Sequence, residues 1–330
     1  MNNGVELEAN GGIKLNNGST KEEKKKPGVL ARTVKNFKRD KYLLLIILPV
    51  IVYFAIFNYF PMYGVLIAFK KFQPLKGILG SPWVGFMYFE QFFKSIYFGR
   101  LMRNTILLSL YSLLWGFPVP IIFALLLNEL RERFFKKLVQ TVSYLPHFIS
   151  IVVVSGMIIN FTSPTDGIIN IILKNFGFES INFMSEPGYF RTIYISSGIW
   201  QEFGWGSIIY LAAIAGIDPQ LYEAAEIDGA SRWSKMMHIT LPCLMPTIII
   251  LLILQVGHLM EVGFEKVLLL YNPSTYETAD VIATFVYKRG IINSEYSFSA
   301  AIGLFNNIIN LTLLITVNYI SRKLSKTSLW

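Results

Sequence analysis

The sequence predicts an all-α membrane protein whose helices form a bundle of six spans. Hydrophobic residues make up 53% of the 330 residues, and the mean hydropathy is +0.47, which is more apolar than a soluble domain of this length. Crossing a bilayer takes roughly 20 apolar residues in a helix. Stretches of about that length occur at residues 42–68, 104–128, 141–162, 192–214, 244–268 and 298–320. These stretches define one membrane domain over residues 42–323.

The distribution of basic residues predicts how the bundle is oriented. Placing the amino terminus in the cytoplasm puts 19 of the 30 Lys and Arg residues inside, ten of them within residues 1–41. This excess agrees with the positive-inside rule and places both termini in the cytoplasm. The formal net charge of +9 is therefore a topology signal. Basic and aromatic residues do not interleave outside the spans, so nucleic acid is excluded as a partner.

Polar segments flank the predicted membrane domain at both ends. Residues 1–27 have little to bury and are expected to be a disordered cytoplasmic tail. Residues 28–41 could form a short basic helix on anionic membrane lipid. The apolar core begins only at Tyr42, too late for an ordinary cleaved signal peptide, so a retained first span is expected. Residues 324–330 form a short cytoplasmic tail.

A polar loop of residues 215–243 separates the fourth and fifth predicted spans, and local signals place two short helices in it. Asp218 can cap the first helix, and Gly229 can end it in a left-handed turn. Ser231 can cap the second helix, which Pro242 then redirects into the fifth span. From spacing alone, this pattern fits a surface for another protein and a hairpin packed on its own bundle equally well.

The motif in this loop favours the first interpretation. Glu-Ala-Ala, then a glycine four residues on, then Leu-Pro a dozen residues later resembles the cytoplasmic coupling loop of ABC importer permeases. The resemblance implies the type I permease fold with a cytoplasmic coupling helix, on which a partner ATPase acts. The residues expected to couple to the ATPase are Glu223, Ala224, Ala225, Gly229, Arg232, Trp233, Leu241 and Pro242. Trp233, Met236 and Met237 would add apolar contact area.

Other segments resemble the carbohydrate branch of these permeases, especially the subgroup for complex oligosaccharides such as alginate or aldouronate fragments. The resemblance covers nearly all of residues 40–323 and includes 61–64, 81–86, 144–150 and 296–305. It implies a bacterial cytoplasmic membrane protein that works by alternating access. The implied partners are a second six-span permease, two ATPase subunits, an extracytoplasmic sugar-binding protein and an oligosaccharide.

The chain is expected to contribute no catalysis of its own. It contains no Gly-x-x-x-x-Gly-Lys-Ser/Thr phosphate loop, so ATP and Mg²⁺ are assigned to the partner ATPase. Its only cysteine, Cys243, excludes an intrachain disulfide and is expected to be buried in a helix. No catalytic residue, metal ligand or cofactor site is therefore predicted in this chain.

Polar side chains inside spans are costly and therefore indicate bundle interiors or cavities. The candidates for the substrate path are Trp200, Gln201, Glu202, Trp205, Gln255, His258 and Glu261. Alternative interpretations remain open: an interface-belt role for the two tryptophans and a simple polar pair for His258 with Glu261. Glu265 is expected at the outer rim and Asp166 and Asp280 in solvent. A further stripe, expected to join helices by hydrogen bonds, comprises Asn306, Asn307 and Asn310.

Three rival functions would use the same residues differently. An ABC importer permease could carry another solute. An ion-coupled secondary transporter could use Glu202 or Glu261 as its ion site, but it would leave the coupling loop unexplained. A membrane-embedded glycosidase or transferase would need these two carboxyl groups close together at a water-filled site.

Overall fold

The structure, a computed structural model, describes residues 41–130, 132–325 and 328. The predicted tail 1–27 and nearly all of the predicted basic helix 28–41 lie outside the described residues. Within the described part, the regular structure is helical apart from one isolated β-bridge. This agrees with the expectation of an all-α fold.

Residue contacts divide the chain into two units, residues 1–62 and residues 63–330. The described part of the first unit consists of α2 (Lys41–Phe54), a π-helical turn (Ala55–Tyr59) and α3 (Phe60–Met62). Every side chain described in this unit is exposed. A helix that is apolar all round suits a surrounding of lipid or of another apolar surface, as expected for a first span.

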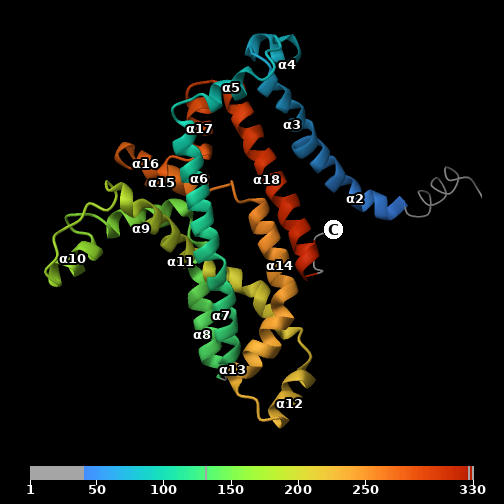
Figure 1. The fold of residues 1–330 in the computed structure, drawn as a ribbon, viewed down its shortest axis with the longest axis vertical. Coiled ribbons are helices and arrows are strands. Elements are labelled where there is room, and N and C mark those ends of the chain that lie inside the picture. Colours follow the sequence, from blue (N-terminus) through green and yellow to red (C-terminus); the bar gives the residue numbers. More distant parts are fainter. Residues whose placement is uncertain (1–40, 131, 326–327, 329–330) are drawn as a thin grey trace, which may run out of the picture. The chain divides into compact units, whose positions relative to one another are not determined.

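The second unit contains the remaining helices, which fall into long spans and short connecting elements. The longer helices are α6 (Phe98–Tyr111), α7 (Pro118–Glu129), α8 (Arg133–Tyr144), α9 (Ile151–Phe161), α11 (Pro187–Ala215), α14 (Leu241–Gly257) and α18 (Tyr296–Ser325). The shorter ones are α4 (Gly77–Gly80), α5 (Met87–Phe93), α10 (Ile168–Asn175), α12 (Pro219–Ile227), α13 (Arg232–Lys235), α15 (Phe264–Leu270), α16 (Tyr276–Ala279) and α17 (Ile282–Tyr287). Within this unit, α12 and α13 lie at one end, and α5 and α17 lie toward the other (Figure 1).

Among the described residues, four helical stretches are long and apolar enough to cross a membrane: Leu45–Phe69, Phe98–Glu129, Arg232–Gly257 and Tyr296–Lys323. A fifth is added if the bent pair of α8 and α9 counts as one span. Helix α11 is not among them, although its 29 residues reach about 44 Å at 1.5 Å per residue. The count of six spans therefore stays a prediction.

The third predicted span, residues 141–162, is not a single straight helix. The helical segment Arg133–Phe148 and helix α9 meet at an angle of 97°. Pro146 lies in the 3-10 turn before the bend, and the Ser150 hydroxyl accepts a hydrogen bond from the Val153 amide at 3.4 Å to begin α9. Proline and a new N-cap together explain why the chain changes direction here.

The fifth predicted span also differs from the structure. Helix α14 ends at Gly257, so residues 244–268 are interrupted before α15 begins. At its other end, Pro242 does not redirect the chain. The helix runs continuously from Arg232 to Gly257, with a π-helical turn directly before Leu241 and Pro242. Proline fits there because the π-helical turn directly before it already departs from the i→i−4 hydrogen-bond pattern that proline cannot continue.

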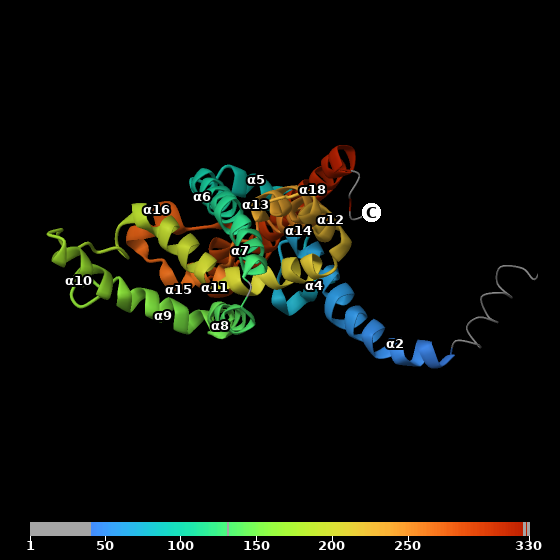
Figure 2. The same ribbon diagram turned by 90° about the horizontal axis from the view of Figure 1, so that it is seen from below.

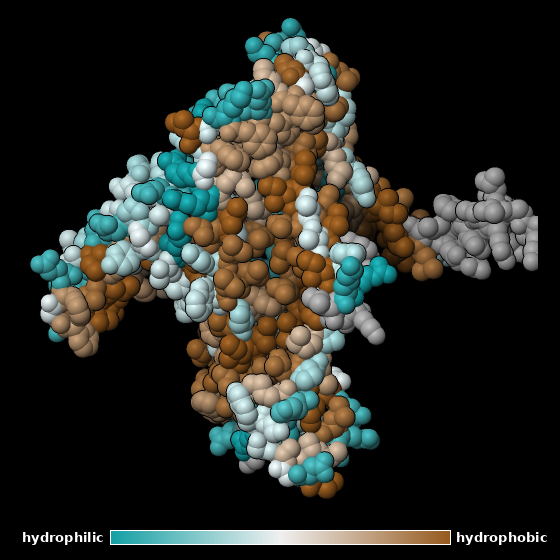
Figure 3. Space-filling model, in the orientation of Figure 1, coloured by the Kyte–Doolittle hydropathy of each residue, from teal (hydrophilic) through white to brown (hydrophobic). Residues whose placement is uncertain are grey.

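An apolar band crosses the middle of the face of the second unit that carries α6, α14 and α18 (Figure 3). Polar side chains border it near α12 and α13 and again near α5. Helices α7 and α14 each pack against α11 (Figure 2), and buried Ala124, Tyr210, Ile214, Met236 and Leu244 form one core cluster. The distribution is that of a bundle whose flanks face lipid.

Polar residues of α18 join this helix to the segment after α14, as predicted. The Asn310 side-chain oxygen accepts a hydrogen bond from the Met260 amide at 2.9 Å, and the Asn306 amide donates to the Met260 carbonyl at 3.4 Å. Asn307, in contrast, is exposed. Asn306 and Asn310 therefore satisfy backbone groups that the end of α14 leaves without helical partners.

Helices α8 and α11 approach so closely at Gly204 that a side chain does not fit. A Cβ atom at this position would overlap the carbonyl group of Ser143 on α8. We expect Gly204→Ala to force the helices apart and to destabilise the fold by about 1–3 kcal/mol. The thermal unfolding midpoint of the purified protein measures this effect. Gly156→Ala in α9 is the control, because a Cβ atom there meets no atom within 4 Å; equal shifts for both variants would contradict the packing.

Candidate functional site

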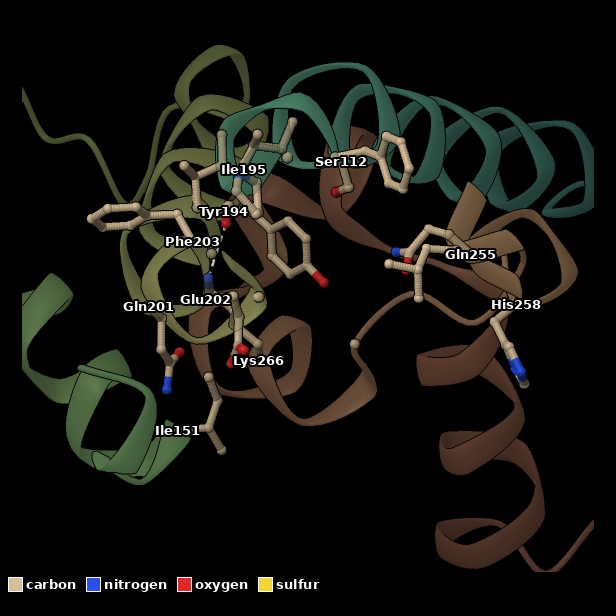
Figure 4. A pocket seen from close by; sticks show the side chains of 18 of the residues that line it. Ser112, Ile151, Tyr194, Ile195, Gln201, Glu202, Phe203, Gln255, His258 and Lys266 are labelled. Atoms are coloured by element: carbon tan, nitrogen blue, oxygen red, sulfur yellow. Dashed lines mark hydrogen bonds between the residues drawn. The ribbon is translucent and has the colours of Figure 1, made fainter. Parts of the chain in front are cut away.

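The second unit contains a cavity of about 910 Å³ (Figure 4). Its walls come from the π-helical turn Ser112–Gly116 and the start of α7, from α9, α11 and α14, and from residues 263–266. This volume lies in the range of small-molecule sites. Backbone that is not helical is tolerated at membrane depth where it lines such a cavity, which accounts for the interruption after Gly257.

Four of the seven predicted path residues line this cavity: Gln201, Glu202, Gln255 and His258. The other three, Trp200, Trp205 and Glu261, do not. The predicted path therefore divides into a cavity wall and a neighbouring group of residues, both held mainly by α11 and the end of α14.

Gln201 links α11 by a hydrogen bond to the bend between α8 and α9. Its side chain is 7% exposed, and its amide donates a hydrogen bond to the Ile149 carbonyl at 3.0 Å. The Ile149 carbonyl lies directly before the N-cap of α9, outside any helix. One polar side chain of the cavity wall thus holds the break in the third span in place.

Glu202 and Trp205 both contact a residue that sequence reasoning did not select. The Nδ1 atom of His147 lies 2.9 Å from Glu202 Oε2, and its ring stacks on that of Trp205 with centroids 4.5 Å apart and planes 2° apart. Trp205 is consequently an aromatic partner of the histidine beside the cavity. His147 belongs to the segment 144–150, and its resemblance to the permease family was the only indication in the sequence that this segment matters for function.

His258 and Glu261 form the satisfied polar pair that was one of the two interpretations open for them. His258 Nδ1 lies 3.1 Å from Glu261 Oε2, and Asn310 donates to the other carboxylate oxygen at 3.3 Å. They do not share a helical face with Gln255, because α14 ends at Gly257. Glu265, expected at the rim, lines the cavity.

Lys266 also lines the cavity and was missed in the sequence. The residue is 7% exposed, its Nζ donates to the Tyr194 carbonyl at 2.9 Å, and it lies 5.0 Å from the centroid of the Tyr194 ring. A lysine inside the predicted apolar stretch 244–268 is itself a signal, since ionisable residues within spans generally have a function. That signal could have found it.

The polar loop 215–243 folds as its local signals predict. Asp218 Oδ1 accepts a hydrogen bond from the Gln220 amide at 3.0 Å and caps α12. Gly229 follows α12 with φ of +76°, a conformation that glycine adopts without strain. Ser231 accepts from the Ser234 amide at 3.2 Å and caps α13. The two caps and the left-handed glycine turn are therefore confirmed, but the second helix is not a separate short one, because it continues into α14.

Most of the predicted coupling residues lie on the surface of this loop. Glu223, Ala224, Gly229, Arg232 and Pro242 are exposed, Trp233 is 65% exposed, and Ala225 and Leu241 are half-buried. Two other expectations were wrong. Met236 is buried against Tyr210 and Leu244 because its helix continues into α14, so it offers no contact area. Cys243 is exposed.

The two outer aspartates differ from each other. Asp166 is exposed, as expected, and hydrogen bonds from Ser163 and Thr165 lower its pKa. Asp280, expected in solvent, is 3% exposed and lies 3.1 Å from Arg100 and 3.9 Å from Lys288.

Among the described residues, no group of three or more His, Cys, Asp or Glu side chains is placed to hold a metal ion.

Residues 116–326, which include the cavity-lining α11 and the loop 215–243, match the family model for the binding-protein-dependent transport system inner membrane component. The chain belongs to this family. It is a multi-pass membrane subunit of an ABC transporter, and its family is one of transport subunits without enzymatic activity of their own. The expected permease fold is confirmed.

The similarity of this permease to known relatives and solved structures extends over nearly its whole length. The polygalacturonan/rhamnogalacturonan transport system permease protein YteP of Bacillus subtilis is 44% identical over 310 residues, covering 94% of this chain and 95% of the relative. A crystal structure of a bacterial ABC transporter that imports the acidic polysaccharide alginate matches with a TM-score of 0.83 and 47% identity, covering 89% of this chain and 99% of that one. The alginate transporter in complex with a periplasmic protein bound to an alginate pentasaccharide matches with a TM-score of 0.84 and 46% identity, covering 90% and 100%.

Proposed function

We propose that this permease moves an oligosaccharide from an extracytoplasmic binding protein into the cytoplasm by alternating access. The chemical character of the cavity lining is the observation that supports this proposal. Its wall combines amide and carboxylate groups, such as Gln201, Gln255 and Glu202, with aromatic rings, such as Phe117 and Tyr210. Sugars need both, because their hydroxyl groups form hydrogen bonds and their C–H faces pack on rings. The carbohydrate cargoes named for YteP and the alginate transporter support the same class of cargo.

The energy for transport would come from partner subunits. We assign a second six-span permease, two ATPase subunits that bind ATP and Mg²⁺, and a sugar-binding protein as partners. The periplasmic protein in the alginate transporter complex supports the last of these. In this arrangement both termini and the loop 215–243 face the cytoplasm, and the exposed surface of α12 and α13 receives the ATPase.

The proposed path begins at the cavity wall. Gln201, Glu202, Gln255 and His258 would contact the sugar directly, because they line the cavity. Trp205 would act through His147, on which it stacks. Trp200 and Glu261 lie outside the lining, and we assign Glu261 to holding His258 in position.

Extraction of the affinity-tagged chain from its native membrane in mild detergent, followed by mass spectrometry, tests the assembly. We expect a second six-span permease and an ATPase to accompany it. Recovery of this chain alone, repeated after crosslinking, would contradict the proposal and would favour an ion-driven transporter.

A further inference from the structure

Lys266 is a buried cation in the cavity wall, and no carboxylate of the described residues contacts it directly. In the part of the chain that the structure describes, no Asp or Glu oxygen lies within 4 Å of its Nζ, and its hydrogen bond goes to the neutral Tyr194 carbonyl. An ammonium group has three donors. The contacts within the chain therefore leave donors of Lys266 for a ligand.

The fold makes room for this ammonium group. Gly198 lies on α11 one turn after Tyr194, and a Cβ atom at Gly198 would stand 3.3 Å from Lys266 Nζ. A larger residue there would crowd the ammonium group. Helix α11 thus provides the Tyr194 carbonyl as an acceptor and, one turn later, the space beside Gly198. The Lys266 ammonium group lies there, at the cavity wall (Figure 4).

A charge this deeply buried is costly unless it is paired. Desolvation of an ammonium group costs several kcal/mol, and a single carbonyl offsets only part of that. The charge of Glu202 acts on Lys266 through space, but Glu202 makes no ion pair with Lys266 within 4 Å and its Oε2 lies 2.9 Å from His147 Nδ1. An anion entering the cavity would therefore find a cation that no acid of the described chain contacts directly.

We propose that the Lys266 ammonium group is the cavity's contact for a carboxylate group of the cargo. The site would then select oligosaccharides that contain uronate residues over neutral ones of the same length. This inference rests on the proposed function and adds a specificity-determining residue to it. A structural role is the competing explanation, in which Lys266 only joins α15 to Tyr194 of α11.

Uptake by proteoliposomes that hold the complete transporter and its binding protein separates the two roles. The probes are a linear tetra-uronate and the same tetramer with its carboxyl groups reduced to CH₂OH. We expect Lys266→Met to lower kcat/KM for the tetra-uronate by about tenfold or more, with less than about a twofold change for the reduced tetramer. Lys266→Arg keeps the charge and should keep most of the preference.

An equal loss for both tetramers with Lys266→Met would overturn the inference and leave the structural role. If the wild-type transporter takes up neither tetramer in the presence of ATP, the proposed function fails instead. Should Lys266→Met not assemble, the wild-type complex provides a second test. Carbodiimide activation of the tetra-uronate carboxyl groups should attach the sugar to Lys266 through an amide bond, and peptide mapping that finds Lys266 unmodified would overturn the inference.

Discussion

Glu223→Lys is expected to stop ATP-driven uptake while the permease still inserts and folds. Glu223 is exposed on α12 and makes no salt bridge within 4 Å in the described part of the chain, so its replacement breaks no contact within the bundle. In the proposed assembly, its charge would pair with a basic group of the ATPase. Reversing one charge of such a pair costs about 2–5 kcal/mol in an interface, which corresponds to a loss of about thirtyfold or more in productive docking.

The readout is the number of sugar molecules imported per ATP hydrolysed, together with the amount of assembled complex. Glu179→Lys in the loop after α10 is the control, because it makes the same charge change at an exposed residue far along the chain from α12. Gly229→Asp tests the geometry of the same surface, since φ of +76° strains most side chains. Normal uptake with Glu223→Lys or with Gly229→Asp would refute the coupling assignment.

Asp280→Ala is expected to destabilise the fold by about 3–5 kcal/mol, because it leaves two partly buried cations without their shared acid. Asp280 lies between Arg100 on α6 and Lys288 after α17 and so joins elements 180 residues apart in sequence. Burial alone would lower the pKa of Lys288, but hydrogen bonds with Tyr271 and Tyr276 and the charge of Asp280 raise it. The hydrogen bonds with Tyr271 and Tyr276 still favour the charged form of Lys288 after the acid is removed.

The thermal unfolding midpoint of the purified permease measures this loss. Asp166→Ala is the control, because Asp166 is exposed and its partners Ser163 and Thr165 are its own neighbours in the loop. We expect a change of less than about 1 kcal/mol for Asp166→Ala. Similar midpoints for the two variants would show that the Asp280 ion pairs add little stability.

Local chemistry explains what could be predicted from the sequence. Asp218, Gly229 and Ser231 act through neighbouring backbone groups, so the short helix α12, the glycine turn and the start of the next helix could be predicted before any tertiary structure was known. Hydropathy identified the apolar stretches, but it does not indicate whether the helix in such a stretch is straight, bent or interrupted. A run of apolar residues looks the same whether the helix continues or bends, and the 97° bend before α9 and the end of α14 at Gly257 were therefore missed.

Interactions between distant segments account for the remaining differences. His147 lies beside Glu202 only because α11 packs against the turn before the bend, 55 residues earlier in the chain. Asp280 resembles a solvated loop residue in the sequence, because its partner Arg100 lies 180 residues away along the chain and meets it only in the folded protein. Lys266 is the exception, because a lysine within an apolar stretch was visible in the sequence.

ATP-dependent uptake of a labelled oligosaccharide by proteoliposomes tests the central claim most directly. The vesicles contain this permease, its partner permease and the ATPase, and the binding protein is added outside. We predict uptake that requires ATP and the binding protein and that persists when ion gradients are collapsed. Uptake that continues without ATP but stops with the gradients would contradict the account and assign the chain to an ion-coupled transporter.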